Sequence, residues 1–287
     1  MSTQNHTQQE KHTTSSSPWG RSGGALEQYM SAHLREVQQK ELSILCAIRD
    51  VCEKNAIDYW LDGGTCLGAV RHGGFIPWDD DIDIAMRRDD IPRFVEAAQR
   101  DLPPHLFMQT MQTDPSCRLP IIKVRDRNSF VVEYGDDFSR PYQKGLFVDI
   151  FPLMPYPDVS RRFCKRVVKG YCRANAILLQ QHVYSWRSVA ELFWFGAKRI
   201  GFAAIWKAAC LLRPMKTYYA NTLETNGYGI RHRRTDIFPT TLINFEGEQF
   251  SAPANPDQYL RNIYGEYMTL PPEDKRKGHA VFYIAQL

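Results

Sequence analysis

One short segment constrains this chain more than any other: Trp78-Asp79-Asp80-Asp81-Ile82-Asp83-Ile84. It places four carboxylates within five positions. Such a cluster is strongly repulsive in a folded protein unless cations or basic groups lie beside it. From Asp81 onward acids and apolar residues alternate, as they do in a half-buried strand, so Asp81 and Asp83 share one face while Ile82 and Ile84 point into the core. The segment therefore predicts a rigidly held pair of carboxylates at a cation site.

A third acid lies in an apolar setting. Asp149 is flanked by hydrophobic residues in the segment Phe147-Val148-Asp149-Ile150-Phe151, which is typical of a strand, and a buried carboxylate needs a compensating partner. Mg²⁺ and Mn²⁺ prefer oxygen ligands, and two such ions about 4 Å apart can serve both the attacking and the leaving oxygen of a transfer. Asp81, Asp83 and Asp149 are therefore predicted to be the catalytic residues and the ligands of two Mg²⁺ or Mn²⁺ ions. The alternative is a solvated acidic loop with helix caps.

A glycine pair precedes the acids. Gly63-Gly64-Thr65 follows a strand expected over Ile57–Leu61 and begins a short helix expected over Thr65–Val70. Backbone N–H groups in such a turn can approach a phosphate, with the N-terminus of the helix facing the anion. The pair is also compatible with an ordinary tight turn.

The first half of the chain predicts an α+β core, a mixed sheet with flanking helices. An amphipathic helix is expected over Leu26–Lys54, and residues 1–24, rich in Ser, Thr, Gln and Gly and without the apolar stretch of a signal peptide, are expected to be a disordered tail. The other elements expected in this half are a helix over Asp89–Arg100 and strands over Leu106–Thr110, Ile121–Arg125, Phe130–Tyr134 and Leu146–Phe151.

The second half is more helical. Helices are expected over Ser160–Tyr184, Ser188–Leu212 and Lys216–Thr225, and then a hairpin around Glu246-Gly247 and a helix that starts at Asn255-Pro256. We therefore expect a catalytic core over residues 25–157, a helical insertion over 158–235, and a C-terminal hairpin and helix over 236–287 that complete the catalytic domain.

Composition excludes several classes of protein. Hydrophobic residues make up 43% and charged residues 24%, as in globular proteins, and a net charge of +4 is too small to indicate nucleic-acid binding. No stretch of about eighteen uncharged apolar residues occurs, so no membrane-spanning helix is expected. The seven cysteines are scattered and form no C-x-x-C pair, which favours free thiols in a reducing cytoplasm.

The segment from Leu61 to Ile84 as a whole closely resembles the LicD family of phosphocholine transferases, which includes the fukutin-related proteins. The resemblance continues from about Leu34 to His279. It is carried further by Lys123-Val124-Arg125, by Gly145-Leu146-Phe147-Val148-Asp149-Ile150-Phe151-Pro152, by Tyr264-Gly265-Glu266-Tyr267-Met268 and by Pro271-Pro272.

The resemblance implies a nucleotidyltransferase-like fold in which Gly63 and Gly64 support a nucleotide-linked donor and the three acids hold the metals. It also implies a CDP-linked donor such as CDP-choline, whose phosphocholine moves to a hydroxyl of a cell-surface glycan precursor (lipopolysaccharide, teichoic acid or capsule) while CMP leaves. Two alternatives stay open. The chain could transfer a polyol phosphate or a nucleotide on the same fold, or it could be a non-catalytic glycan-binding or regulatory relative.

Several side chains near the motif are further candidates for contact with the donor. Thr65, Arg71 and Lys123 are predicted to lie at its phosphates, since guanidinium and ammonium groups bind phosphate. A choline headgroup would favour an aromatic cage, for which Trp78 is the first candidate, followed by Tyr59, Trp60 and Phe75. Each of these is equally compatible with a surface or packing role.

Two segments outside the motif suggest wider contacts. The helix expected over Ser188–Leu212 mixes aromatic and basic residues, a composition suited to a membrane interface or to a core helix, and peripheral contact with the inner face of the cell membrane is expected on this basis. Lys275, Arg276, Lys277 and His279 form a basic group that could close over the donor or be a solvated tail.

Overall fold

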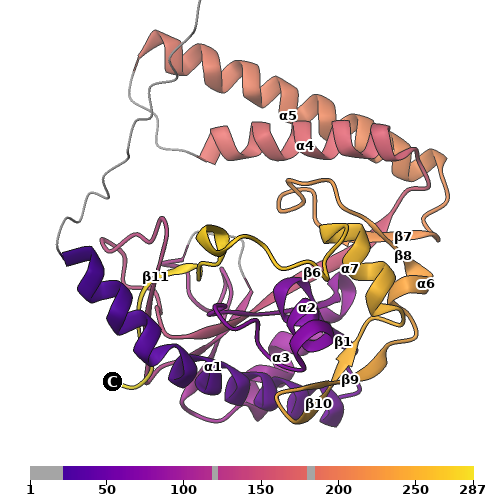
Figure 1. Ribbon diagram of the computed structural model, residues 1–287. Helices are drawn as coiled ribbons and strands as arrows, with labels where there is room; N and C mark the ends of the chain where they lie inside the picture. Colours follow the sequence, from indigo (N-terminus) through magenta and orange to yellow (C-terminus); the bar gives the residue numbers. More distant parts are fainter. Residues whose placement is uncertain (1–21, 118–121, 180–184) are drawn as a thin grey trace, which may run out of the picture.

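A mixed sheet of seven strands carries the fold in this computed structural model, which describes residues 22–117, 122–179 and 185–287 (Figure 1). The parallel pair β2 and β6 lies at its centre, and the other pairings within the sheet are antiparallel. Along the sheet the order is β1 (Tyr59–Leu61), β2 (Ile82–Arg87), β6 (Phe147–Tyr156), β4 (Lys123–Asp126) and β3 (Leu106–Gln109), and the far end of β6 also pairs with β7 (Tyr218–Asn221), which pairs with β8 (His232–Arg233).

Helices α1 (Ser22–Lys54), α2 (Gly63–His72) and α3 (Ile91–Asp101) pack on one face of this sheet. Ile44, Ile48 and Phe94 meet Ile82 and Ile84 there, and all five are fully buried. The opposite face packs against α6 (Arg234–Ile237) and α7 (Pro256–Tyr264) through a smaller apolar cluster made of Trp60, Ala85, Leu153, Ile237 and Tyr259. Because alternate residues of β2 enter the two cores, the strand is fixed in register.

Two small antiparallel sheets flank the main one. The strand β5 (Phe130–Glu133) pairs with β11 (Ala280–Ile284) near the C-terminus, and β9 (Thr241–Phe245) pairs with β10 (Glu248–Ala252) as a hairpin. One-turn helices occur at η1 (Arg88–Asp90) and η2 (Glu273–Lys275). Val37 of α1 packs on Val131 and Tyr283, so the first helix holds the C-terminal strand against the rest of the molecule.

Two long helices, α4 (Arg161–Leu179) and α5 (Trp186–Leu212), lie side by side at one end of the molecule (Figure 1). A Cβ at Gly170 would lie 2.3 Å from the ring of Phe202, so the absence of a side chain at this position permits the close approach of the two helices. Trp206 of α5 packs on Tyr156 of β6 and ties the pair to the sheet. None of the helices in the described ranges combines the length and the apolar character needed to cross a bilayer.

The predicted α+β class is confirmed, and most predicted strands start within two residues of the observed ones. The helix expected over Lys216–Thr225 is wrong, because Tyr218–Asn221 forms the strand β7. The reason is tertiary: β6 extends beyond its partner β4, and the edge that β4 leaves free pairs from Leu153 to Tyr156 with this tyrosine-rich segment. Of the tail expected over residues 1–24, only 22–24 lie within the described residues, where they belong to α1, and the last residues of the helix expected over Ser160–Tyr184, 180–184, fall outside them.

Candidate active site

The alternation in the acidic segment is realised in the structure. Ile82 and Ile84 are fully buried, whereas Asp83 is half-buried and the side chain of Asp81 is 20% exposed. Asp81 lies immediately before β2, and Asp83 is the second residue of that strand. The two apolar side chains therefore anchor the strand in the core, so that the carboxylates between them are held rather than mobile.

Strand pairing brings the third acid to the first two. In the parallel ladder of β2 and β6, Asp83 is directly opposite Asp149, whose side chain is 23% exposed. Burial raises the pKa of the Asp83 carboxyl well above its usual range, and the negative charges of Asp81 and Asp149 raise it further. Because each of these carboxylates makes ionisation of the others less favourable, a positive charge at this point of the sheet would stabilise them.

The glycine pair lies directly against these acids. Asp62 caps α2 by accepting a hydrogen bond from the Gly63 N–H at 2.8 Å. Gly63 has a φ of +49°, and a Cβ on it would lie 2.9 Å from Oδ2 of Asp83. A Cβ on Gly64 would lie 2.9 Å from Oδ2 of Asp79. The hydroxyl of Thr65 accepts a hydrogen bond from the N–H of Asp83 at 2.8 Å, so this turn positions the acids as well as leaving their surroundings open.

Substitution of Gly64 by alanine should test this close approach. The new methyl would force the buried Asp79 carboxylate to move, and we expect a loss of about 1–3 kcal/mol in the free energy of unfolding. Catalytic turnover should fall at least tenfold, because small displacements of a catalytic group are costly. Gly24→Ala is the matched control: no atom of the described residues lies within 4 Å of its Cβ position, so stability by thermal denaturation and turnover should both be retained. Equal behaviour of the two variants would contradict the account.

Lys123 occupies the space between two carboxylates. Its Nζ lies 3.2 Å from Oδ2 of Asp149 and 2.9 Å from Oε1 of Glu133, and it sits 3.3 Å from the centre of the Phe147 ring. Only 5% of the side chain is exposed. Burial raises the pKa of Asp149 to about 6 even though the Lys123 charge opposes the rise. Sequence reasoning did not identify Glu133, which lies on β5, a strand of a separate small sheet, ten residues after Lys123.

The remaining predicted donor contacts lie further out. Arg71, in the last turn of α2, donates a hydrogen bond to the carbonyl of Tyr267 at 2.8 Å. Trp78 is half-buried, and the guanidinium of Arg276 lies 5.2 Å from its ring centre. The cage expected from Tyr59, Trp60 and Phe75 is not formed, because all three rings are buried in apolar clusters. Arg71 and Trp78 stay predictions as donor contacts.

The C-terminal segment supplies a histidine that sequence reasoning placed only in a basic group. The Nδ1 atom of His279 lies 3.4 Å from Oδ1 of Asp79 and 3.2 Å from Oδ2 of Asp81. Hydrogen bonds to these two acids raise the pKa of His279 to about 11. The buried Asp80 accepts hydrogen bonds from the N–H groups of His279 and Ala280, at 2.6 and 3.0 Å. The segment before β11 is thereby fastened onto the acidic loop.

Comparison with known proteins agrees with this geometry. Residues 56–170 match the family model described as LicD/FKTN/FKRP, nucleotidyltransferase domain. The lipopolysaccharide cholinephosphotransferase LicD of Haemophilus influenzae is 32% identical over 268 residues, which cover 86% of this chain and 96% of the relative. The chain belongs to the LicD family. The human ribitol 5-phosphate transferase FKRP is 49% identical over 117 residues, 39% of this chain and 20% of that protein.

The residues of this LicD family member fit a divalent cation. Glu41 of α1 is fully buried, and neither of its carboxylate oxygens has a hydrogen-bond partner within the described part of the chain. Burial raises its pKa well above the usual range, and the charge of Asp81 is the next contribution. A buried carboxyl that has no hydrogen-bond partner and lies beside other carboxylates is unfavourable unless positive charge is near. Hard divalent cations, which take oxygen ligands, are suited to supply that charge.

Two overlapping sets of acids could supply the ligands. Asp79, Asp80, Asp81 and His279 each offer one ligand atom, and these atoms lie within 4.8 Å of one another. The predicted set of Asp81, Asp83 and Asp149 shares Asp81 with this group and continues along the paired strands. An acidic metal site is thus available, and Asp81 lies where the two sets meet.

Proposed function

We propose that the chain transfers phosphocholine, or a related phospho-alcohol, from a CDP-linked donor to a hydroxyl of a cell-surface glycan precursor. Membership of the LicD family makes it a phosphotransferase. The observation that carries the proposal is the match along nearly the whole length of a lipopolysaccharide cholinephosphotransferase. The cluster of acids at the ends of β2 and β6 supports a reaction at phosphorus, where charge on the phosphoryl oxygens must be neutralised.

The proposed roles follow from the positions of the side chains. Asp81, Asp83 and Asp149 would hold Mg²⁺ or Mn²⁺, which when bound offsets negative charge on the phosphate and on the departing oxygen. Gly63 and Gly64 add no side chain of their own beside Asp83 and Asp79, which would let the donor phosphates approach the start of α2. Lys123 keeps Asp149 paired and oriented.

In the proposed step the acceptor hydroxyl oxygen attacks the phosphorus that carries choline. The bond from that phosphorus to the CMP oxygen breaks, and CMP leaves with the bonding electron pair. The hydroxyl proton passes to a carboxylate oxygen of Asp149, which is partly exposed and has a pKa of about 6. Atoms and charge balance without any further reactant.

The direct experiment measures CMP release. CDP-choline and a glycan acceptor should yield CMP only when Mg²⁺ or Mn²⁺ is supplied, and chelation should stop the reaction. Parallel assays with CDP-ribitol and CDP-glycerol separate phosphocholine transfer from polyol phosphate transfer, which the resemblance to human FKRP keeps as the second candidate. Tight donor binding without turnover of any donor would instead favour a non-catalytic role.

The helix pair α4 and α5 supports peripheral contact with an anionic membrane. Several large apolar side chains of α5 face solvent: Trp186, Phe193, Trp194, Ile200, Leu211 and Leu212 are between 60% and 91% exposed. The two helices carry a single acidic residue, Glu191, whereas the chain as a whole has a net charge of only +4. Their basic residues are Arg161, Arg162, Lys165, Arg166, Lys169, Arg173, Arg187, Lys198, Arg199 and Lys207.

This combination of exposed apolar and basic residues suits the headgroup region of a bilayer, where a lipid-linked acceptor would be presented. It supports a cytoplasmic protein on the inner face of the cell membrane. Of the three tryptophans of α5, Trp206 is buried against Tyr156 and so belongs to the core rather than to the membrane face.

Liposome co-sedimentation tests the membrane contact. The protein should sediment with vesicles of phosphatidylcholine and phosphatidylglycerol, more weakly at high salt because the charge attraction is screened. Combined Phe193→Ala and Trp194→Ala substitutions should weaken binding at least tenfold, since each ring removed takes away apolar surface that would enter the bilayer. Leu242→Ala, at a 67% exposed position on β9, is the control and should bind as the original protein does. Equal binding by all three proteins would refute the proposed contact.

A further inference from the structure

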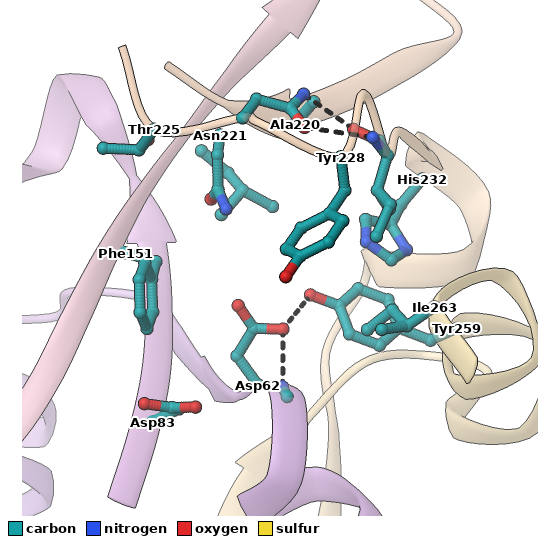
Figure 2. Close-up of a pocket in the computed structure, with 14 residues that line it drawn as sticks. Asp62, Asp83, Phe151, Ala220, Asn221, Thr225, Tyr228, His232, Tyr259 and Ile263 are labelled. Carbon is teal, nitrogen blue, oxygen red and sulfur yellow. Dashed lines mark hydrogen bonds between the residues drawn. The ribbon is translucent and has the colours of Figure 1, made fainter. Parts of the chain in front are cut away.

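A pocket of about 170 Å³ opens directly beside Asp83 (Figure 2). Its walls come from α2, from β6 and β7, from the loop between β7 and β8, and from α7. Because Asp83 and Gly63 both line it, a group bound there adjoins the carboxylates to which we assign the reaction. None of the aromatic residues predicted from sequence to surround a choline headgroup lines this pocket.

The charge of the lining selects the kind of group that can enter. Two of the lining residues, Asp62 and Asp83, are carboxylic acids, and among the described residues of the wall there is no lysine or arginine. His232 adds no positive charge near neutral pH, since burial lowers its pKa to about 3. An anionic nucleotide or phosphate would be repelled from such a wall, whereas a cation would be attracted.

Two oxygen atoms of the lining lack partners. Oδ1 of Asp62 accepts hydrogen bonds from the Gly63 N–H and from the Tyr259 hydroxyl at 2.6 Å, but within the described chain Oδ2 accepts none. Only 9% of Asp62 is exposed. Oδ1 of Asn221 is likewise buried, with no hydrogen-bond partner within the described residues. A buried acceptor without a donor, such as Oδ1 of Asn221, is costly, and positive charge placed beside it relieves the cost.

Aromatic rings supply the other walls. Figure 2 shows Phe151 on one side of the Asp62 carboxylate and Tyr228 on the other, with the tyrosine hydroxyl directed toward Asp62. Tyr228 is 81% exposed, although its loop is fixed by Asn226, whose side chain bonds both the N–H and the carbonyl of Ile230. An aromatic face held open beside a carboxylate is suited to a quaternary ammonium group.

We propose that this pocket binds the cationic headgroup of the transferred alcohol, with Tyr228 and Phe151 against its methyl groups and Asp62 as its counter-ion. The proposal rests on the proposed function, and it selects a choline-like headgroup over a neutral polyol. Asp62 then has two tasks, because the same side chain also caps α2.

Donor affinities of the full-length protein, measured by titration calorimetry with Mg²⁺ and without acceptor, test the assignment. Tyr228→Leu should weaken binding of CDP-choline roughly tenfold, while binding of CDP-glycerol changes less than twofold. Tyr228→Phe keeps the ring and should lose far less affinity for CDP-choline than Tyr228→Leu. Asp62→Asn keeps an oxygen for the helix cap but removes the charge, so it should also act selectively on CDP-choline. Equal loss for both donors, or no loss, would overturn the proposal.

Failure of the proposed function can be distinguished from failure of the proposed headgroup pocket. If the original protein releases no CMP from CDP-choline, phosphocholine transfer is refuted whatever the variants do. The pocket is then judged with tetramethylammonium chloride alone, compared with sodium chloride at equal concentration. A rise in Tm for the original protein but not for Tyr228→Leu supports a quaternary ammonium site, and no difference between the two proteins overturns it.

Discussion

Asp83→Asn should abolish turnover while leaving the protein folded. Asparagine keeps the size of the side chain but removes the charge that would hold the cation, and we expect CMP release to fall roughly a thousandfold or more. Without metal, the variant should melt at the same temperature as the original protein or higher. The reason is that Asp83 faces the charges of Asp81 and Asp149 in a buried setting, and neutralising it relieves their repulsion.

Both CMP release and Tm must be measured for Asp83→Asn, and a control variant must be measured beside it. Asp50→Asn makes the same chemical change at an exposed position whose charge, among the residues that the structure describes, pairs with Arg49 alone, and it should keep full turnover. Mg²⁺ or Mn²⁺ should raise the Tm of the original protein and of the control, but not that of Asp83→Asn. Turnover within tenfold of the original protein, or an equal rise in Tm with metal, would show that Asp83 holds no cation.

Lys123→Met should damage stability as well as activity. The substitution keeps an extended side chain on the Phe147 ring but leaves Asp149 without the Lys123 cation, while Glu133 keeps an ion pair with Arg125 at 3.2 Å. Removing one partner from a buried pair is strongly destabilising, and because Glu133 is 34% exposed we expect a loss on the order of 3 kcal/mol, at the low end for such pairs. Turnover should fall at least a hundredfold, because Asp149 loses the contact that orients it.

A second substitution shows whether repulsion is the cause. Asp149→Asn introduced into Lys123→Met removes the carboxylate whose one ion pair among the described residues was with Lys123, and it should recover part of the lost free energy of unfolding in urea denaturation. Lys54→Met, which breaks a surface pair with Asp101 where the lysine is 66% exposed, should cost less than 1 kcal/mol. If Lys123→Met were no more destabilising than Lys54→Met, the proposed role of Lys123 would be wrong.

Local sequence patterns predicted the parts of the fold that local chemistry controls. The alternation of Asp and Ile placed Ile82 and Ile84 in the core, and the glycine pair placed the start of α2 within two residues of Gly63, where it begins. The direct pairing of Asp83 with Asp149 follows from the parallel register of two strands that are distant in the sequence. The sequence identified both acids as candidates, but it did not predict the strand register that places them opposite each other.

Other features of the site depend on contacts that no spacing reveals. Glu41 lies in the middle of a long helix and His279 in a basic C-terminal stretch, and only the tertiary fold brings either of them to the acids. The strand β7 was mistaken for a helix for the same reason, since the exposed edge of β6 decides its conformation. Tyr59 and Phe75 are close to the motif in sequence, but their rings are buried in the apolar core.

The central claim is that Asp81, Asp83 and Asp149 hold a divalent cation at the ends of β2 and β6. Crystals grown with Mn²⁺ and CDP-choline, measured for anomalous scattering at the manganese edge, test it most directly. The account predicts a manganese peak within about 2.3 Å of carboxylate oxygens from all three residues. A peak coordinated only by Asp79, Asp80 and His279, or no peak near β2 at all, would contradict it.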